Sequence, residues 1–574
     1  MSQKVTFFLQ LRRAFSTQQR VLPKQGPLLS DFLHVKDAGN SLTESSTFHH
    51  QTSPTDCEEI IGDLNLNTQE GTFPRTVALE TYGCQMNVSD TELVRSILLD
   101  AGFNLIAKFS DPQTTPADAV LLMTCSIREN AETKIFERID ALRHCHEHAN
   151  SKLGLKKKQS QRPLLVGILG CMAERLKGVL TTGKRCADVV CGPDAYRSLP
   201  QLLRTTGITG MPSINVQLSI EETYAELRPV RVDPSSKAAF VSIMRGCDNM
   251  CSYCIVPFTR GRERSRPFHT IINEVRHLVE QEDVKVVTLL GQNVNSYLDQ
   301  TMAATATLED ASHLAPGFKT IYKQKLAGAN VARFADLLDI LSEKFPKTWF
   351  RFTSPHPKDF PMSLLKLMSE RSNICKHIHL PAQSGSSSVL DRMRRGYTRE
   401  AYIDLLNTIR DTIPGVTIST DIIVGFCGET DAEFEETLSL LEIAKYDTGY
   451  LFSYSQRAKT HAARTMSDDV PEEIKSKRLR RLIDRFYQIA DDLVKEKWIG
   501  KKELVLLEGP SRRAEKEWRG RNQGNKMVII KEGYQETMAN LHRDDGVLCC
   551  GDFVELEIIG GTASTLFGKL IRKM

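Results

Sequence analysis

Short apolar runs alternate with amphipathic segments along most of the chain, and this alternation constrains the fold more than any other feature. Between residues 235 and 465 the unit repeats six times. The predicted strands are Phe240–Met244, Lys285–Leu290, Trp349–Phe352, His377–Leu380, Val416–Val424 and Gly449–Tyr454. The segments between them, such as Ile271–Val279 and Ala401–Ile409, have helical periodicity. Such alternation predicts an α/β fold, and six units with polar residues after each strand predict a partial (β/α)6 barrel.

Three earlier apolar runs each end in a cysteine. They are Thr76–Cys84, Ala119–Cys125 and Leu164–Cys171. A helical pattern follows each run, and after the first run Ser89 to Glu92 matches a capping box that would start the helix. Parallel strands end at one edge of their sheet, so we expect Cys84, Cys125 and Cys171, the N-terminal cysteine set, to share one crevice. Cys191 ends a fourth run and is a further candidate.

The last part of the chain has a different texture. A charged helix is predicted over Glu472–Lys497, and short β-like runs separated by glycines and charges follow it. The runs are Leu504–Leu507, Met527–Ile530, Val547–Leu548 and Val554–Ile559. Short strands at this spacing predict a small C-terminal β-barrel. Residues 299–332 fit no strand–helix unit and are interpreted as an insertion.

Composition bounds the class of protein. A chain of 574 residues suggests two to four domains, and 41% apolar with 25% charged residues excludes collagen-like, mostly disordered and multi-span membrane proteins. The net charge of +4 does not by itself indicate a nucleic-acid partner. Fourteen cysteines in a chain of this size, several of them clustered, favour metal ligands in a reducing compartment over disulfides.

The N-terminus is basic. Residues 1–30 contain five lysines and arginines and no acidic residue, a composition typical of a mitochondrial transit peptide. A disordered basic tail is the alternative interpretation. Residues 31–74 are polar and aperiodic, and we interpret them as a disordered linker.

Three cysteines follow the first strand of the predicted barrel with the spacing C-x3-C-x2-C. Cys247, Cys251 and Cys254, the barrel cysteine set, would place three soft ligands on one tight loop. Three thiolates suit three corners of a cubane iron–sulfur cluster and leave one iron open. A zinc site would need a fourth ligand nearby, and the next histidine is His269. A zinc knuckle or simply buried thiols remain the alternatives.

This spacing, with Tyr253 before the last cysteine and at the end of a barrel's first strand, resembles the radical S-adenosylmethionine (SAM) superfamily. The resemblance implies that the open iron binds SAM and that reductive cleavage releases a 5′-deoxyadenosyl radical. In such enzymes the cofactor does the difficult chemistry, while the protein positions and shields it.

Longer motifs narrow the resemblance. They are Tyr82-Gly-Cys84-Gln-Met-Asn87, Cys125-Ser-Ile-Arg128-Glu-Asn130, Gly170-Cys171-Met-Ala-Glu174-Arg175 and Cys254-Ile-Val-Pro257-Phe-Thr259-Arg260-Gly261. Together they resemble the methylthiotransferase family over nearly all of residues 75–574. The resemblance implies a methylthiotransferase N-terminal domain over residues 75–200, a radical SAM core over 233–490 and a TRAM domain over 493–574.

The family resemblance also implies cofactors and site residues. It implies two [4Fe–4S] clusters: one on the barrel cysteine set, which cleaves SAM, and one on the N-terminal cysteine set, which holds the sulfur to be transferred. Strand-end residues are then expected to bind SAM. These are Tyr253, Gly291, Gln292, Asn293, Gln383, Ser384, Gly385, Thr420 and Asp421. Without the resemblance, a glycine and asparagine at a strand end simply indicate a turn.

Two groups of arginines stand out. Arg260, Arg262, Arg264 and Arg266 alternate after the barrel cysteine set, and are either a solvated edge or ligands for a phosphate or carboxylate. In the C-terminal barrel the resemblance to TRAM domains implies RNA binding. The arginines expected to contact the RNA backbone are Arg512, Arg513, Arg519 and Arg521.

The family has three branches that differ in substrate. The branch that acts on isopentenyl-adenosine in tRNA is similar to this chain in two motifs, Gly83-Cys84-Gln85-Met86-Asn87 and Val256-Pro257-Phe258-Thr259. With the basic N-terminus, this implies methylthiolation beside the anticodon of mitochondrial tRNA. The alternatives are the threonylcarbamoyl-adenosine branch, or a cluster-bearing regulatory protein without turnover that binds a partner such as a kinase. The expected partners are a tRNA anticodon stem-loop and an electron donor, with no membrane, and we expect a monomer.

Overall fold

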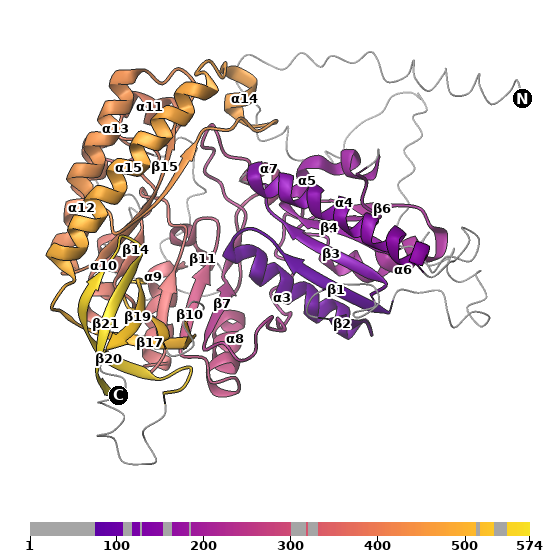
Figure 1. Cartoon of the computed structure of the whole chain (residues 1–574), viewed down its shortest axis with the longest axis horizontal. Coiled ribbons are helices and arrows are strands. Elements are labelled where there is room, and N and C mark those ends of the chain that lie inside the picture. The colour runs from indigo at the N-terminus through magenta and orange to yellow at the C-terminus, as the bar shows by residue number, and fades with distance from the viewer. Residues whose placement is uncertain are drawn as a thin grey trace, which may run out of the picture. The chain divides into compact units, whose positions relative to one another are not determined.

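The computed structural model describes residues 75–106, 109, 117–126, 129–152, 164–182, 185–299, 317–319, 331–511, 517–532 and 548–574. The expected transit peptide (1–30) and linker (31–74) lie outside these residues. Residues from Thr72 onward form one compact unit, in which a parallel sheet, a half-open barrel and a small closed barrel follow one another along the chain (Figure 1).

The N-terminal part is a six-stranded sheet in the order β2-β1-β3-β4-β5-β6, with every neighbouring pair parallel. Its strands are β1 (Thr76–Thr81), β2 (Asn104–Ile106), β3 (Ala119–Thr124), β4 (Leu165–Gly170), β5 (Val189–Cys191) and β6 (Ser213–Asn215). Its helices are α3 (Gln85–Asp100), α4 (Glu129–Lys152), α5 (Cys171–Leu176), η2 (Lys177–Thr181), η3 (Tyr196–Ser198) and α6 (Leu199–Thr209). Strand β6 lies beyond residue 200, so the sheet continues past the boundary expected for this domain.

Helices cover both faces of this sheet, which is why its strands are apolar on both sides. Leu93 of α3 and Leu203 of α6 pack on one face, in a core with Leu121 of β3. Ile135 of α4 packs on the other face with Val120. The predicted parallel α/β arrangement is confirmed, although the short edge strands β2 and β6 were not predicted.

The central part has two three-stranded parallel sheets, β13-β10-β7 and β14-β15-β16. Its strands are β7 (Ala238–Ser242), β8 (Met244–Arg245), β9 (Arg264–Ser265), β10 (Val286–Leu290), β11 (Leu298–Asp299), β12 (Ala332–Arg333), β13 (Trp349–Phe352), β14 (His377–His379), β15 (Thr417–Val424) and β16 (Thr448–Ser453). Its helices are α7 (Val256–Thr259), α8 (Phe268–Glu280), η4 (Val294–Ser296), α9 (Phe334–Lys344), α10 (Met362–Glu370), α11 (Ser387–Arg392), α12 (Arg399–Thr412), α13 (Asp431–Ala444), α14 (His461–Thr465) and α15 (Glu472–Lys497).

All six predicted strands of the partial barrel are confirmed. Strand residues that alternate toward the helices, such as Val241, Val287 and Ile418, form one large core with the helices. Strands β11 and β12 pair antiparallel at the two ends of the expected insertion, with Asp299 opposite Ala332. This ladder closes the base of the insertion, and most residues between the two strands lie outside the described ranges.

The C-terminal part is a closed barrel in the order β17-β18-β19-β21-β20. Its strands are β17 (Lys502–Pro510), β18 (Trp518–Asn522), β19 (Met527–Glu532), β20 (Phe553–Gly561) and β21 (Thr565–Lys573). The predicted small barrel is confirmed, but β18 and β21 were missed because glycines and charges interrupt their apolar pattern. The strand predicted at Val547–Leu548 is wrong at Leu548, which belongs to no strand, and Val547 is outside the described residues.

The C-terminal barrel packs against the strands of the central barrel. Trp349 at the start of β13 lies edge-on to Phe553, with ring centroids 4.9 Å apart. Arg351 donates to the carbonyl of Asn522 at 2.7 Å, and Thr417 donates to that of Gly524 at 2.8 Å. Since strands β13 and β15 begin near these contacts, the C-terminal barrel covers the end of the central barrel opposite the strand-end loops.

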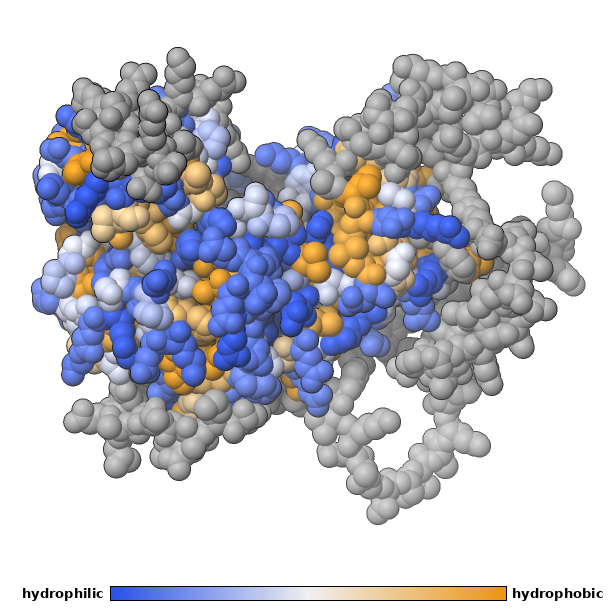
Figure 2. Space-filling view, turned by 90° about the horizontal axis from the view of Figure 1, so that it is seen from below, coloured by the Kyte–Doolittle hydropathy of each residue, from blue (hydrophilic) through white to orange (hydrophobic). Residues whose placement is uncertain are grey.

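The face shown in Figure 2 is mostly hydrophilic, with apolar patches between the hydrophilic residues, one of them on the side of the N-terminal sheet. Within the described parts of the chain, no helix combines the length and the apolar character of a membrane span.

Candidate functional site

The N-terminal cysteine set lies at one edge of the parallel sheet, as predicted. Cys84 is the N-cap of α3, Cys125 directly follows β3, and Cys171 opens α5 directly after β4. The turns require glycine: Gly83 has φ +106°, and a Cβ there would lie 2.6 Å from the Cβ of Cys125. A side chain at Gly83 would therefore push Cys84 and Cys125 apart.

The predicted capping box is wrong, because α3 begins at Gln85 rather than after Ser89. Ser89 to Glu92 are instead buried within the helix. The early start places Cys84 at the helix terminus, where the backbone N–H groups of Met86 and Asn87 help to lower its pKa. The largest cause is a hydrogen bond with Cys125, and together these effects bring the pKa of Cys84 to about 6.

Arg260 of the central barrel reaches into the N-terminal cysteine set. Its Nε donates to the Sγ of Cys171 at 3.0 Å, and its Nη2 lies 3.4 Å from Oδ1 of Asn87. Burial raises the pKa of the Cys171 thiol, and the guanidinium of Arg260 opposes that rise. A cation is therefore held at the sulfur that desolvation would otherwise keep neutral.

Asp90 is the buried counter-ion of this region. Its Oδ2 lies 2.6 Å from Nη1 of Arg260, and its Oδ1 lies 2.9 Å from Nη2 of Arg245. Tyr196 donates its hydroxyl to Oδ2 at 3.1 Å. Burial alone would raise the pKa of Asp90, but the two arginines hold it below its usual value. Asp90 was not predicted as a site residue. Its position between apolar residues of a predicted helix could have indicated that it is buried.

Of the alternating arginines, Arg260, Arg264 and Arg266 are buried, and Arg262 is partly solvated. All four form ion pairs with carboxylates of the protein itself. Arg260 pairs with Asp90, Arg262 with Asp248, Arg264 with Asp194 and Arg266 with Glu274. Arg260 and Arg264 bind residues of the N-terminal part, whereas Arg262 and Arg266 bind the cysteine loop and α8. The segment therefore fastens the two parts together.

The barrel cysteine set lies on the loop after β8. Gly246 starts the loop with φ +75°, where a Cβ would be 2.0 Å from the carbonyl oxygen of Arg262. The amide of Cys247 donates to the carbonyl of Gly261 at 3.3 Å, and that of Cys254 donates to Cys251 at 3.0 Å. Ser252 fixes the middle of the loop by donating its hydroxyl to the carbonyl of Arg392 at 2.8 Å.

Arg395 is the cation of the barrel cysteine set. Its Nη1 donates to Sγ of Cys251 at 3.3 Å and lies 3.5 Å from the hydroxyl of Tyr253. Its other nitrogens donate to the hydroxyl of Tyr397 and to the carbonyl of Pro381. Among the described residues it forms no ion pair with a carboxylate, although its side chain is buried.

The donors of both cysteine sets are of the kind that iron–sulfur clusters use. No three His, Cys, Asp or Glu side chains in the described residues converge closely enough to hold one ion. In a cubane cluster, each cysteine binds a separate iron, so the sulfurs need not converge. Each set offers soft sulfur donors at one loop edge, and each has a buried arginine N–H on a cysteine sulfur. Such outer hydrogen bonds are typical of cluster ligands.

The residues predicted to bind SAM at the end of β10 differ in what they can contact. Gly291 packs tightly, since a Cβ would lie 2.5 Å from Cγ of Met244. Gln292 has a buried Oε1 without a hydrogen-bond partner in the described part of the chain. The amide of Asn293 is already bound to Oδ2 of Asp359 at 2.8 Å. Gln292 thus offers the open polar atom for a ligand.

The predicted residues of the second half-barrel mostly join elements together. Ser384 and Gly385 contact Thr437 of α13 through their hydroxyl and amide groups, at 3.2 and 3.0 Å. Gln383 has φ +69° and bonds through its backbone to β15. The buried Thr420 donates to the carbonyl of Leu380 at 2.9 Å, whereas the half-exposed Asp421 faces His379 at 3.3 Å.

A buried polar cluster beside the barrel cysteine set was not predicted. Burial raises the pKa of Glu263 to about 8, and Ser296 donates to its Oε2 at 2.6 Å. Lys358 and Asp359 form a buried pair at 3.0 Å. Glu263 lies between two of the alternating arginines. Because side chains of an extended segment alternate in direction, its position could have indicated a carboxyl group that faces inward.

The arginines predicted to bind RNA are only partly described. Arg512 and Arg513 lie outside the described residues. Arg521 is half-buried and pairs with Glu508 at 3.1 Å, and Arg519 has a buried Nε without a hydrogen-bond partner among described residues. Cys191, the further candidate ligand, is buried in β5 and donates to the carbonyl of Ala195 at 3.2 Å, inside the domain core.

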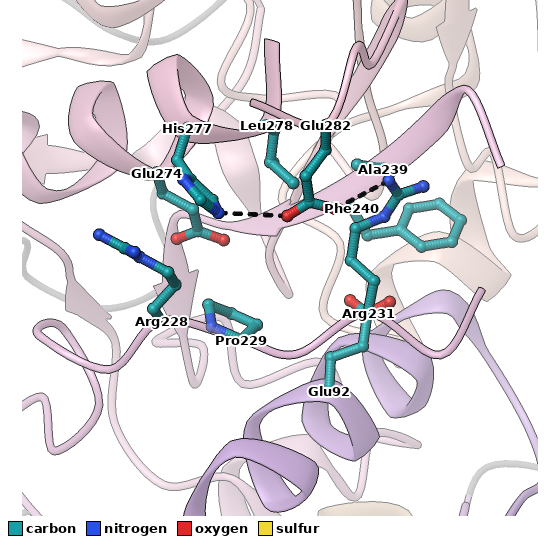
Figure 3. A pocket seen from close by; sticks show the side chains of 10 residues that line it. All are labelled: Glu92, Arg228, Pro229, Arg231, Ala239, Phe240, Glu274, His277, Leu278 and Glu282. Atoms are coloured by element: carbon teal, nitrogen blue, oxygen red, sulfur yellow. Dashed lines mark hydrogen bonds and ion pairs between the residues drawn. The ribbon is translucent and has the colours of Figure 1, made fainter. Parts of the chain in front are cut away.

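A pocket lies between α3, β7 and α8 and contains none of the predicted site residues. Figure 3 shows Glu92 of α3 on one side and Glu274 and His277 of α8 on the other. Arg231 pairs with Glu282 at 3.0 Å across it. Burial raises the pKa of Glu92 to about 7. The pocket is therefore a polar junction between the N-terminal and central parts.

Comparison with known proteins gives matches over both parts. The family model described as the radical SAM superfamily matches residues 241–441, and that of Uncharacterized protein family UPF0004 matches residues 76–192. The mouse (Mus musculus) protein named mitochondrial tRNA methylthiotransferase CDK5RAP1 is 47% identical, covering 93% of this chain and 89% of that protein. The Caenorhabditis elegans CDK5RAP1-like protein is 43% identical, covering 96% and 93%.

A bacterial relative and a solved structure also match. The tRNA-2-methylthio-N(6)-dimethylallyladenosine synthase of Chloroherpeton thalassium is 43% identical, covering 86% of this chain and 96% of that protein. The radical S-adenosylmethionine methyltransferase TsrM from Kitasatospora setae aligns with a TM-score of 0.43 and 13% identity, covering 68% of this chain and 77% of that one.

Proposed function

The chain belongs to the radical SAM tRNA methylthiotransferase family, and from this membership we propose its reaction: a methylthio group is added to C2 of N6-isopentenyl-adenosine next to the anticodon of mitochondrial tRNAs. The observation that carries the proposal is the presence of two separate cysteine sets, linked by Arg260. Sulfur transfer needs both a site for radical generation and a site for the sulfur, whereas SAM cleavage alone needs one.

The barrel cysteine set would hold the [4Fe–4S] cluster that binds SAM. When bound, the cluster and SAM supply the radical chemistry of the superfamily. The protein contributes a buried cation, Arg395, beside Cys251, and the unpartnered Oε1 of Gln292 at the end of β10. Gln292 is the proposed polar contact for SAM. Asn293 is proposed to keep that strand end in place through Asp359.

The N-terminal cysteine set would hold a second cluster and the sulfur to be transferred. Its three sulfurs come from separate strand ends. Arg260 of the central barrel contacts one of them, the sulfur of Cys171. A fixed distance between the two sites favours transfer, because the reacting groups must meet within a few ångströms. The substrate base would be splayed out of the RNA loop to enter between the sites.

The remaining assignments follow from the same proposal. The C-terminal barrel is proposed to be a TRAM domain that binds the tRNA backbone through Arg512, Arg513, Arg519 and Arg521. Residues 1–30 would direct the chain to mitochondria. An external electron donor would reduce the enzyme, and the monomer would carry both cysteine sets.

The test is an anaerobic reaction with the reconstituted full-length protein, SAM, a reductant and an anticodon stem-loop carrying isopentenyl-adenosine. Nucleosides are then analysed by mass spectrometry. The expected product is methylthiolated isopentenyl-adenosine, with no product from a matched stem-loop carrying unmodified adenosine. Product only from a threonylcarbamoyl-adenosine stem-loop would assign the other branch. Iron-loaded protein that cleaves no SAM would overturn the proposed function altogether.

A further inference from the structure

Arg260 belongs to the segment that follows the barrel cysteine set. Its side chain extends from that segment to the N-terminal cysteine set. It stands six residues after Cys254, at the end of α7, and the amide of Arg260 closes that helix by donating to Val256 at 2.8 Å. Its guanidinium then contacts Cys171, Asn87 and Asp90.

From this geometry we propose that Arg260 is a positioning residue, which holds the N-terminal cysteine set in register with the SAM loop and tunes the cluster bound there. This inference rests on the proposed two-cluster function. Arg260 acts through the sulfur of Cys171, to which its Nε donates at 3.0 Å.

The charge balance around Asp90 allows Arg260 to act on the sulfur. Asp90 is completely buried, and its single negative charge is shared by Arg260 and Arg245. Glu222 lies 3.9 Å from Nε of Arg245, so Arg245 has a second carboxylate nearby, whereas among the described residues Arg260 pairs with Asp90 alone. Arg260 therefore shares Asp90 with Arg245, and the sulfur of Cys171 is the further partner that its Nε contacts.

A positive N–H donor on a ligand sulfur stabilises the more negative, reduced form of an iron–sulfur cluster. Hydrogen bonds to sulfur are among the factors that set cluster potentials. The presence of Arg260 should therefore raise the reduction potential of the N-terminal cluster. Because the same side chain is fixed to α7, the sulfur of Cys171 and the SAM loop are also kept at a constant separation.

The chain provides a matched control in the same segment. Arg264 also crosses to the N-terminal part, where it pairs with Asp194 at 2.8 Å and donates to the carbonyl of Ser219 at 2.7 Å. Its side chain is as buried as that of Arg260, but it contacts no cysteine in the described residues. Arg264 also donates to the backbone carbonyl of Arg260 at 2.9 Å, so its substitution disturbs the junction around Arg260 while removing no donor to sulfur.

The experiment uses full-length protein in which Cys247, Cys251 and Cys254 are replaced by alanine, so that only the N-terminal set can hold a cluster. After anaerobic reconstitution, iron is counted and the reduction potential is measured by a titration followed by electron paramagnetic resonance. The parent is compared with Arg260→Met, Arg260→Lys and Arg264→Lys. Arg260→Met should fold, since Asp90 keeps Arg245 and the hydroxyl of Tyr196 as partners.

We expect about four irons per chain in the parent and a lower potential with altered resonance signals in Arg260→Met. Arg260→Lys should lie between the two, because it keeps the charge and loses the fixed donor geometry. Arg264→Lys should match the parent. A parent without iron would overturn the two-cluster function and this inference together. Iron-loaded Arg260→Met with the parent's potential would overturn only the role of Arg260.

Discussion

The two cysteine sets are built in opposite ways. In the barrel set all three cysteines lie within eight residues on one loop, which Gly246 and Ser252 hold in place. In the N-terminal set they come from three strand ends that are 41 to 46 residues apart in sequence. The first is a property of one loop, whereas the second exists only once the sheet has formed.

The arginines beside the two sets differ in the same way. Arg260 shares the carboxylate of Asp90 with Arg245, while Arg395 has hydroxyl, carbonyl and sulfur partners and no carboxylate ion pair in the described residues. A buried charge without a counter-charge is costly. In the proposed function a bound cluster would supply the negative charge beside Arg395, whereas Asp90 supplies it beside Arg260. The difference suggests that the two sites can be separated by experiment.

The largest effect should come from removing each cysteine set in turn. Replacing Cys84, Cys125 and Cys171 by alanine should abolish methylthio product while sparing reductive SAM cleavage to 5′-deoxyadenosine. Replacing the barrel set should abolish both, because radical generation depends on the open iron of that loop. Both products are measured in one anaerobic reaction.

The double alanine variant of Cys186 and Cys191, outside the two sets, is the control for lost thiols, and should retain both products. If the protein without Cys84, Cys125 and Cys171 still made methylthiolated tRNA, those cysteines would be structural. The difference between the two sets would then concern folding and not chemistry.

The next effect concerns the carboxylate on which the N-terminal site depends. Asp90→Asn leaves Arg245 and Arg260 buried with no carboxylate between them, which should lower the free energy of unfolding by about 3–5 kcal/mol. The measurement is chemical unfolding of the iron-free protein. Asp100→Asn, at an exposed position of the same helix, should change it by less than about 0.5 kcal/mol. Equal effects of the two substitutions would show that Asp90 carries no special charge balance.

A smaller effect on the free energy of unfolding should have opposite signs when Arg395 and Arg260 are substituted. In iron-free protein, Arg395→Met removes a buried charge without a carboxylate partner and should stabilise the fold by about 1–3 kcal/mol. Arg260→Met removes one partner of Asp90 and should destabilise it by a similar amount. Unfolding midpoints of both variants are compared with the unsubstituted chain. The same sign for both would contradict the proposed difference in charge compensation.

The same contrast explains what could be predicted from the sequence. The barrel set is local, so the spacing of Cys247, Cys251 and Cys254 indicates it directly. The N-terminal set was predicted through the rule that parallel strands end at one edge, and the structure confirms the edge. The pairing of Asp90 with Arg260 could not be predicted, because it joins residues 170 positions apart in sequence. The apolar neighbours of Asp90 could have indicated that it is buried, but only tertiary packing shows which cations it contacts.

The strand-end residues teach a related lesson. Sequence position correctly placed Ser384 and Gly385 after a strand, whereas Thr420, expected at a strand end, lies inside β15. In neither case did it predict the direction in which the polar groups would point. In the structure these groups bind α13 and a neighbouring backbone carbonyl. Local pattern therefore predicts which edge of a sheet a residue occupies, while its partner depends on helices that arrive later in the chain.

The smallest expected effect tests the junction that carries the N-terminal set. Glu92 (Figure 3) lies on α3 with Asp90, in the helix that Cys84 caps. It accepts a hydrogen bond from the amide of Val232 at 3.2 Å. Burial raises its pKa from 4.5 to about 7, while Val232 and Arg231 oppose the rise and Glu274 adds to it. The folded state therefore binds a proton that the unfolded state has lost between these pH values.

The sign follows from that proton. Because the folded chain holds it more tightly, stability from Glu92 is complete below pH 4.5 and is lost as pH rises through about 7. Glu92→Gln cannot lose the proton, so its unfolding free energy relative to the wild type should increase between pH 5 and pH 8, by at most about 3 kcal/mol. Glu280→Gln, exposed on α8, should show no such trend. Parallel pH curves for wild type and Glu92→Gln would mean that the junction stays hydrated, and that the N-terminal site does not depend on a dry contact with the barrel.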